Sequence, residues 1–158
     1  MRILFLGAGA VGGYFGGRMA QTGVGATFLV RGPRAEQLRD GLKIESPLGH
    51  ARVSVKTLTA GESATAFDLV VLTNKAYGLA GALEAIAPHV NPNTIILPLL
   101  NGMSHLAKIE ARFPGATVWG GVAQIGAVLA PNGAIQHVIP VQGLIIGPRA
   151  GQDGSRPQ

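Results

Sequence analysis

The sequence opens with MRILFLGAGAVGGYFGG, residues 1–17, which joins a short apolar run to a cluster of glycines. Residues 2–6 are mostly apolar and end at a glycine, which is typical of a strand buried on both faces of a parallel sheet. From Ala10 to about Gln21 apolar residues recur at four-residue steps, which predicts a helix. The chain is therefore expected to begin with a strand, a glycine-rich turn and a helix.

The turn between this strand and this helix matches the pattern Gly-x-Gly-x-x-Gly. The first glycine permits a tight bend, the second lets the backbone approach a diphosphate, and the third lets the helix pack close to the strand. The helix N-terminus offers unpaired N–H groups and positive dipole to the anion. We therefore expect a dinucleotide here; the alternative is a turn that is glycine-rich for packing alone. The expected cofactor-binding residues of the turn are Gly7, Ala8, Gly9, Ala10, Val11 and Gly12.

The second apolar run, residues 26–30, is followed by a cation rather than an acid. Proteins that prefer NAD usually carry Asp or Glu at this strand end, about 20 residues after the turn, to accept a hydrogen bond from the ribose 2′-OH. Arg31 stands there instead, and a guanidinium pairs with the 2′-phosphate that a carboxylate would repel. The sequence therefore favours NADP(H) as the cofactor. Arg34 is either a second phosphate partner or a solvated residue of the next short helix.

The rest of the chain first repeats this alternation and then changes to strands alone. Further strands are predicted at 68–73 and 94–100, helices at 34–40, 76–87 and 104–113, and a small hairpin or edge insertion within 42–55. The last three predicted strands, 117–130, 134–139 and 143–146, are joined by short turns and should be antiparallel. This order predicts an α/β fold: a Rossmann-type, mainly parallel sheet with helices on both faces, extended by antiparallel C-terminal strands.

Two polar side chains follow buried strands of the predicted sheet. Lys75 comes after the strand at 68–73, and Asn101 comes after the strand at 94–100. Ligands of open α/β sheets bind at such carboxyl ends, where a lysine can hold a carboxylate or a cofactor oxygen and an amide can fix a ribose or a nicotinamide edge. The alternatives are a surface lysine in a first helical turn and an asparagine that caps the following helix.

Composition argues against several other classes of function. The chain has no Cys, which excludes disulfides and thiolate chemistry and fits a cytoplasmic protein, and its four His are too scattered for a metal site. The net charge is +5, but the basic residues are dispersed and aromatics are only 5%, which argues against nucleic-acid binding. No run of 18 apolar residues indicates a membrane span.

Five stretches together resemble the 2-dehydropantoate 2-reductases, also called ketopantoate reductases. They are residues 1–17, Val30-Arg31, Thr73-Asn74-Lys75-Ala76-Tyr77, Leu100-Asn101-Gly102-Met103, and Gly120–Gly126 before a hairpin. The resemblance, which extends to about residue 147, implies NADPH-dependent reduction of ketopantoate to pantoate, on the route to coenzyme A. It also implies that Lys75 and Asn101 lie near the nicotinamide, and that backbone at Gly126 touches the cofactor.

The resemblance further implies a helical C-terminal domain that supplies the principal catalytic lysine and a substrate-binding glutamate. We expect residues 1–147 to be the NADP-binding domain and residues 148–158 to be a polar tail or the start of a linker to that absent domain. Cofactor binding with little turnover of a 2-keto acid is then expected from this chain alone. The alternatives are a stand-alone NADP-binding module, a subunit completed by a partner or a second copy through surface that the missing domain would cover, and a reductase for another 2-keto or hydroxy acid.

Overall fold

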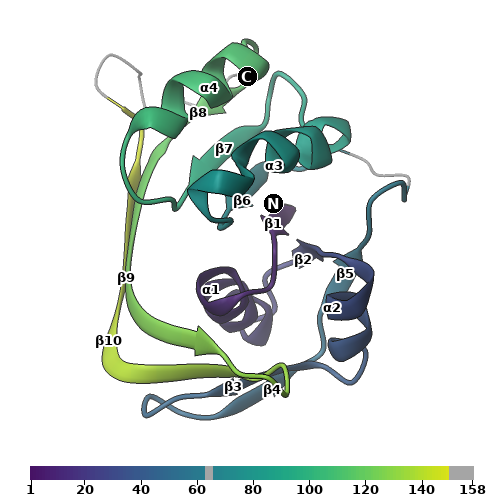
Figure 1. Cartoon of the computed structure of the whole chain (residues 1–158), viewed down its shortest axis with the longest axis vertical. Helices are drawn as coiled ribbons and strands as arrows, with labels where there is room; N and C mark the ends of the chain where they lie inside the picture. The colour runs from purple at the N-terminus through teal and green to yellow at the C-terminus, as the bar shows by residue number, and fades with distance from the viewer. Residues whose placement is uncertain (63–65, 150–158) are drawn as a thin grey trace.

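The computed structural model describes residues 1–62 and 66–149, which form two sheets with helices between and outside them (Figure 1). The first sheet has six strands, in the order β5-β2-β1-β6-β7-β8. Its strands are β1 (Ile3–Leu6), β2 (Ala26–Leu29), β5 (Lys56–Leu58), β6 (Leu69–Leu72), β7 (Ile95–Pro98) and β8 (Thr117–Val118). Every neighbouring pair in this sheet is parallel.

Helices cover both faces of the parallel sheet. On one face lie α3 (Leu79–Ile86), flanked by the short 3-10 turns η1 (Ala76–Gly78) and η2 (Ala87–His89), and α4 (Ser104–Arg112). The other face is covered by α1 (Ala10–Gln21), and α2 (Gly32–Gln37) follows β2. The central strands are therefore buried on both sides, which explains why their sequences are continuous apolar runs.

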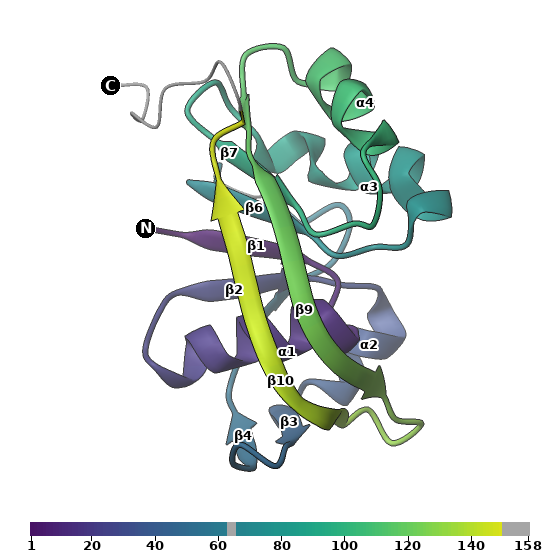
Figure 2. The same ribbon diagram turned by 90° about the vertical axis from the view of Figure 1, so that its left-hand side faces the viewer.

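The second sheet lies on the far side of α1 from the first (Figure 2). Its order is β4-β3-β10-β9, with β3 (Leu42–Glu45), β4 (Ala51–Val53), β9 (Gly120–Leu129) and β10 (Ile135–Gly147). The long strands β9 and β10 form an antiparallel hairpin, and β10 also pairs in parallel with β3. Helix α1 is thus enclosed between two sheets.

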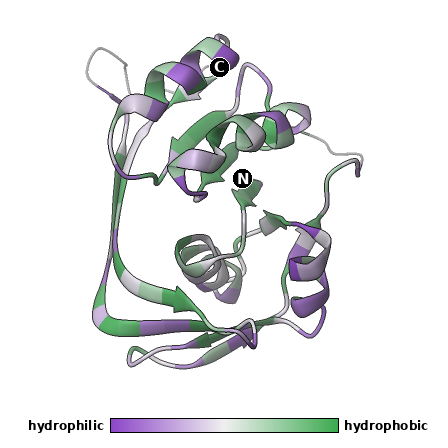
Figure 3. Cartoon of the chain, in the orientation of Figure 1, coloured by the Kyte–Doolittle hydropathy of each residue, from purple (hydrophilic) through white to green (hydrophobic). Residues whose placement is uncertain are grey.

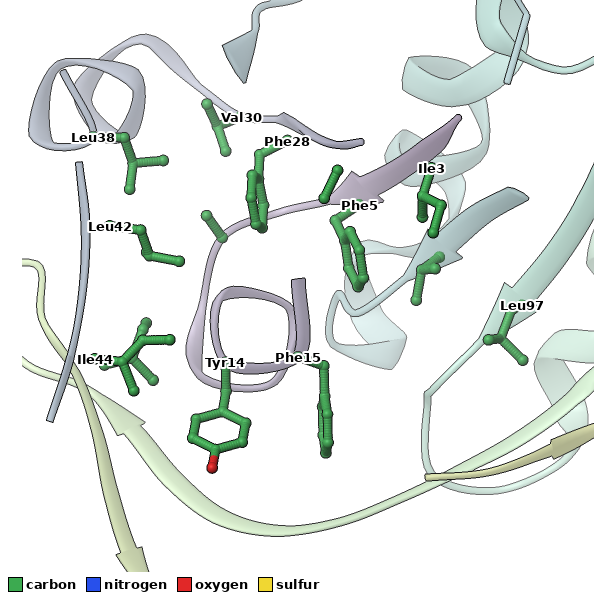
Figure 4. Close-up of a cluster of buried hydrophobic side chains, with 14 residues drawn as sticks. Ile3, Phe5, Tyr14, Phe15, Phe28, Val30, Leu38, Leu42, Ile44 and Leu97 are labelled. Carbon is green, nitrogen blue, oxygen red and sulfur yellow. The ribbon is translucent and has the colours of Figure 1, made fainter. Parts of the chain in front are cut away.

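One core cluster fills the space around α1 (Figure 4). The rings of Phe5 and Phe28 stack with centroids 5.5 Å apart and lie against α1 at Gly16. A Cβ added at Gly16 would lie 2.7 Å from the Phe28 ring, and one at Gly17 would lie 2.5 Å from Leu42 on the other side. Glycines therefore let α1 approach both sheets closely. A second cluster joins the opposite face of the parallel sheet to α3 and α4.

The structure confirms the α/β class, the Rossmann-type parallel sheet and the helices on both faces. It differs in how the C-terminal strands are arranged. The segment predicted as one strand, 117–130, is divided between β8 in the parallel sheet and β9 in the second sheet. The two strands predicted at 134–139 and 143–146 are one strand, β10, with irregular pairing between His137 and Gln142. These antiparallel strands form a second sheet rather than an extension of the first.

Three smaller differences concern single elements. The predicted hairpin exists as β3 and β4, but the residues after it form a further parallel strand, β5, beside β2. The predicted helix at 34–40 begins two residues earlier, at Gly32, because Arg31 is its N-cap and Pro33 is accepted in a first turn. The tail predicted at 148–158 lies outside the described residues except for Pro148 and Arg149.

Candidate functional site

The candidate site lies at the carboxyl edge of the parallel sheet. The pairing registers place Leu6, Leu29, Leu72 and Pro98 level with one another at the ends of four adjacent strands. The chain leaves β1 to reach β2 on one side, whereas β6 lies on the other side of β1. Such a reversal of strand order opens the crevice in which doubly wound sheets bind their ligands.

The glycine turn at the end of β1 has the geometry that its sequence predicts. Gly7 has a φ of 91°, a value that L side chains rarely adopt. A Cβ added at Gly12 would lie 2.5 Å from Thr73 Oγ1 and 2.6 Å from Gly7 O, so this position accepts only glycine without a backbone shift. The Thr73 hydroxyl donates to Leu6 O at 2.9 Å, which ties the end of β6 to the turn.

The middle of the turn faces open space. A Cβ at Gly9 would meet no atom within 4 Å. Gly9 is the N-cap of α1, and the first intrahelical bond runs from Gly13 N to Gly9 O at 2.8 Å. The amides of Ala10, Val11 and Gly12 therefore have no acceptor within the helix, and no acidic residue occupies the first turn. These N–H groups can hold an anion such as a diphosphate.

The two arginines after β2 have different environments. Arg31 is exposed at the N-cap of α2, and its side chain makes no hydrogen bond or ion pair with any described residue. Arg34 is half-buried, and its guanidinium donates to Ala8 O, Gly133 O and Gln37 Oε1. Burial lowers the pKa of Arg34 from its ordinary value. Most of the donors of Arg34 are thus used by protein acceptors, whereas Arg31 has no side-chain partner among the described residues.

Lys75 and Asn101 are exposed and follow two adjacent strands, β6 and β7. Lys75 is the N-cap of η1 and its backbone is extended. Asn101 does not cap α4, because the N-cap of that helix is Met103 and has no side-chain capping bond. The structure therefore brings both residues to the edge that carries the glycine turn, with their side chains available. Their roles stay predictions.

Gly126 lies on β9 in the second sheet, opposite Ile139 of β10. A Cβ there would lie 2.7 Å from Ile139 Cδ1, so packing within the hairpin already explains why this residue is glycine. The predicted contact of Gly126 with a cofactor stays a prediction.

Two polar residues at this edge were not singled out from the sequence. Thr73 braces the turn, as described above. Asn74 donates from Nδ2 to Lys75 O at 2.9 Å, while its buried Oδ1 has no hydrogen-bond partner. Their position directly after the buried strand β6 is the feature of the sequence that could have indicated both residues as part of the site. Among the described residues, no three His, Asp or Glu side chains gather in a way that could hold a metal ion.

Comparison with known proteins identifies the family. A family model described as ketopantoate reductase PanE/ApbA matches residues 3–151. The chain belongs to the ketopantoate reductase family. The uncharacterized oxidoreductase YkpB of Bacillus subtilis is 38% identical over 157 residues, which is 99% of this chain and 52% of that protein. The 2-dehydropantoate 2-reductase of Pyrococcus horikoshii is 35% identical, over 86% of this chain and 44% of that protein.

Solved structures of ketopantoate reductases share the fold of this family member. The 2-dehydropantoate 2-reductase of Geobacter metallireducens aligns with a TM-score of 0.87 and 29% identity, over 97% of this chain and 51% of that chain. A D-mandelate dehydrogenase, solved with NADH and anilino(oxo)acetate, aligns with a TM-score of 0.81 at 24% identity, which shows the fold alone. The chain spans about half the length of the relatives it matches. No helix in the described part of the chain is both long and apolar enough to cross a membrane.

Proposed function

We propose that this chain is the NADPH-binding part of a cytoplasmic 2-dehydropantoate 2-reductase. The observation that supports the proposal most strongly is the glycine turn at the switch point of the sheet. There the first-turn amides of α1 are uncommitted and the space above Gly9 is open. Membership of the ketopantoate reductase family supports the same assignment.

The residues present fit a phosphorylated dinucleotide. The amides of Ala10 to Gly12 would hold the diphosphate, and a side chain at Gly9 would fill the space that the diphosphate needs. Arg31, which is exposed at the end of β2 and has no side-chain partner among the described residues, would hold the 2′-phosphate. Lys75 and Asn101 would face the nicotinamide end from the strands β6 and β7.

The bound NADPH would supply a hydride to the carbonyl carbon of a 2-keto acid. Lys75 can bind the substrate carboxylate as a cation, and the Asn101 amide can orient the nicotinamide or the carbonyl. Both side chains are exposed on an open edge, whereas efficient hydride transfer needs the reactants held at close distance and a positioned proton donor. We therefore expect these 158 residues to bind the cofactor and to turn over little ketopantoate.

A calorimetric titration with NADPH and NADH tests the proposal. The unsubstituted chain should bind both nucleotides and prefer NADPH. Arg31→Ala should weaken NADPH by about tenfold, the effect of losing a charge-assisted hydrogen bond, and leave NADH nearly unchanged. Equal loss for both nucleotides would contradict the phosphate role of Arg31. Absence of binding for either nucleotide would contradict the proposal itself.

The alternative substrate is a 2-keto or 2-hydroxy acid other than ketopantoate or pantoate. The D-mandelate dehydrogenase that shares the fold was solved with NADH and a 2-oxo acid analogue, so the same scaffold serves a different substrate and cofactor there. The calorimetric titration with NADPH and NADH described above separates the two cofactors. An assay with ketopantoate and with phenylglyoxylate, run on a full-length relative, separates the two substrates.

A second candidate function is a subunit completed by a second copy of the chain. The outer face of the β9–β10 hairpin favours it, since several apolar side chains of both strands are exposed, and Figure 3 shows apolar stretches along both strands. Val122 and Ile145, which are directly paired, are 56% and 65% exposed. No other described element covers this face (Figure 2). Exposed apolar surface of this kind marks interaction sites.

Sedimentation velocity tests this pairing. The chain should form a concentration-dependent dimer, and the double variant Val122→Ser with Ile145→Ser should remain monomeric because the shared apolar surface is lost. Leu48→Ser is the matched control, since Leu48 is an exposed apolar residue on another element, the turn between β3 and β4. A monomer at every concentration of the unsubstituted chain would contradict the pairing.

A further inference from the structure

We propose that Arg34 is a positioning residue that sets the orientation of the Ala8–Gly9 peptide in the diphosphate-binding turn. The inference rests on the proposed dinucleotide function and adds a residue to it. Arg34 is carried by α2, whereas the turn that it holds is 26 residues earlier in the chain.

The guanidinium of Arg34 joins three segments. Two of its N–H groups donate to one carbonyl: Nε lies 3.0 Å from Ala8 O, and Nη2 lies 2.7 Å from the same oxygen. Nη1 donates to Gly133 O at 2.9 Å and to Gln37 Oε1 at 3.0 Å. Arg34 therefore connects the glycine turn to the β9–β10 turn across a half-buried contact.

The two hydrogen bonds to Ala8 O also fix the direction of the Gly9 N–H, which belongs to the same peptide. A trans peptide is planar, so its C=O and its N–H point in opposite directions. With Ala8 O held by Arg34, the N–H of Gly9 points away from α2. Gly9 lies where a Cβ would meet no atom within 4 Å. The contact thus orders the part of the turn that a diphosphate would approach, without Arg34 touching the diphosphate.

The donor count separates Arg34 from a phosphate ligand. An arginine has five N–H donors, and the four hydrogen bonds of Arg34 use all but one of them. Without breaking contacts that place the turn, a ligand phosphate could reach only the one remaining N–H of Nη2 and could not form the paired contact of an arginine fork. Gly133 supports the same arrangement: its φ is 83°, and a Cβ there would lie 2.9 Å from Nη1 of Arg34.

The test compares Arg34→Met and Arg34→Lys with Arg31→Ala. NADPH, NADH and adenosine 2′-monophosphate are titrated at a temperature well below the melting point of every variant. Loss of the paired hydrogen bonds to Ala8 O should lower the affinities for NADPH and for NADH by the same factor, about tenfold. The affinity for adenosine 2′-monophosphate should not change. Arg31→Ala should instead lower the affinities for NADPH and for adenosine 2′-monophosphate. Gln37→Ala, which removes only the side-chain partner of Nη1, should leave the affinities for NADPH and NADH unchanged.

If the Arg34 variants lost affinity for NADPH but not for NADH, the inference would be overturned, because Arg34 would then bind the 2′-phosphate. Unchanged affinity for both nucleotides would overturn it as well. If Arg34→Met does not fold, Arg34→Lys keeps the charge without the paired grip and is judged by the same outcomes.

The amide NMR signal of Gly9 in the nucleotide-free protein gives a readout that a general loss of stability would not move. It should shift in Arg34→Lys and stay in place in Gln37→Ala. An unmoved Gly9 signal in Arg34→Lys would overturn the inference even if the unsubstituted chain bound no nucleotide, the outcome that contradicts the proposed function.

Discussion

Gly7, Gly9 and Gly12 lack a side chain for three different physical reasons. Gly7 adopts a positive φ of 91° at the bend after β1. Gly12 is pressed against the backbone of Gly7 and the side chain of Thr73. Gly9 faces open space and is unconstrained by its neighbours. Two of the glycines therefore serve the fold, whereas no neighbouring atom requires a glycine at position 9, where the proposed diphosphate would lie.

This difference predicts opposite results for two matched alanine substitutions. Gly12→Ala should destabilise the protein by about 1–3 kcal/mol, because its Cβ would overlap the main-chain oxygen of Gly7. Gly9→Ala should leave the free energy of unfolding within about 0.5 kcal/mol of the original, since its Cβ meets nothing. Gly9→Ala should nevertheless weaken NADPH by about tenfold or more, because the methyl group occupies the diphosphate space.

Urea unfolding and calorimetric titration measure the two effects separately. If Gly9→Ala binds NADPH as tightly as the unsubstituted chain, the open space at the turn does not hold the diphosphate.

At the residue scale, local spacing predicted the position of the glycine turn, of the cation after β2 and of the polar residues after β6 and β7. The structure places all of them at one edge of the parallel sheet, and their roles in binding stay predictions. Arg34 could not be assigned, because its partners Ala8 and Gly133 are 26 and 99 residues away. Only the folded arrangement brings those carbonyls to one guanidinium.

At the scale of elements, α1 is fixed by contacts to both sheets. Tyr14 is fully buried on the side of α1 that faces the second sheet, and its hydroxyl donates to Gln142 Oε1 at 2.5 Å (Figure 4). Gln142 lies at the end of the irregular part of β10. The bond therefore joins the helix that carries the candidate site to the longest strand of the second sheet.

A double-mutant cycle tests this connection. Tyr14→Phe should lower the free energy of unfolding by about 1 kcal/mol, since it removes one hydrogen bond while keeping the ring in the core. Gln142→Ala should have a similar effect. In the double variant the loss of unfolding free energy should be smaller than the sum of the two single losses. The difference, the coupling energy of the pair, should be about 1 kcal/mol by urea unfolding. Fully additive losses would show that the bond contributes nothing.

The division of the C-terminal strands was beyond local sequence reasoning. Residues 117–130 read as one apolar strand, but Trp119 separates the parallel strand β8 from β9. Which sheet a strand joins depends on pairing with distant partners such as β3 and β7. By contrast, the strands β1, β2, β6 and β7 were predictable because burial on both faces leaves a continuous apolar run.

At the scale of the whole molecule, two buried histidines lie on the side of the parallel sheet that carries α3 and α4. His89 packs against Phe67, and its Nδ1 has no hydrogen-bond partner. His105 is buried in α4. Burial lowers the pKa of both histidines from the ordinary value of 6.5. The folded state therefore favours their neutral forms.

Stability should fall as the pH drops below about 6.5, because the unfolded chain then binds protons that the folded chain resists. Above that pH both states are neutral at these positions and the contribution is fully present. Urea unfolding at pH 7.5 and 5.5 should show a loss of about 1 kcal/mol or more at the lower pH. His89→Leu should reduce the loss. The pKa of Glu84 is lowered by Arg112, so Glu84 titrates below this window. A free energy of unfolding that does not change between the two pH values would contradict this account.

The most direct test of the central claim is a map of backbone amide NMR signals during a titration with NADPH. The largest shifts should fall on Gly9, Ala10, Val11 and Gly12, with a second group at Val30 and Arg31, because the proposed binding mode puts the diphosphate and the 2′-phosphate beside these residues. Repeating the titration with NADH should keep the first group and lose the second. Shifts confined to other parts of the chain, or no shifts at saturating NADPH, would contradict the assignment of this turn as a dinucleotide site.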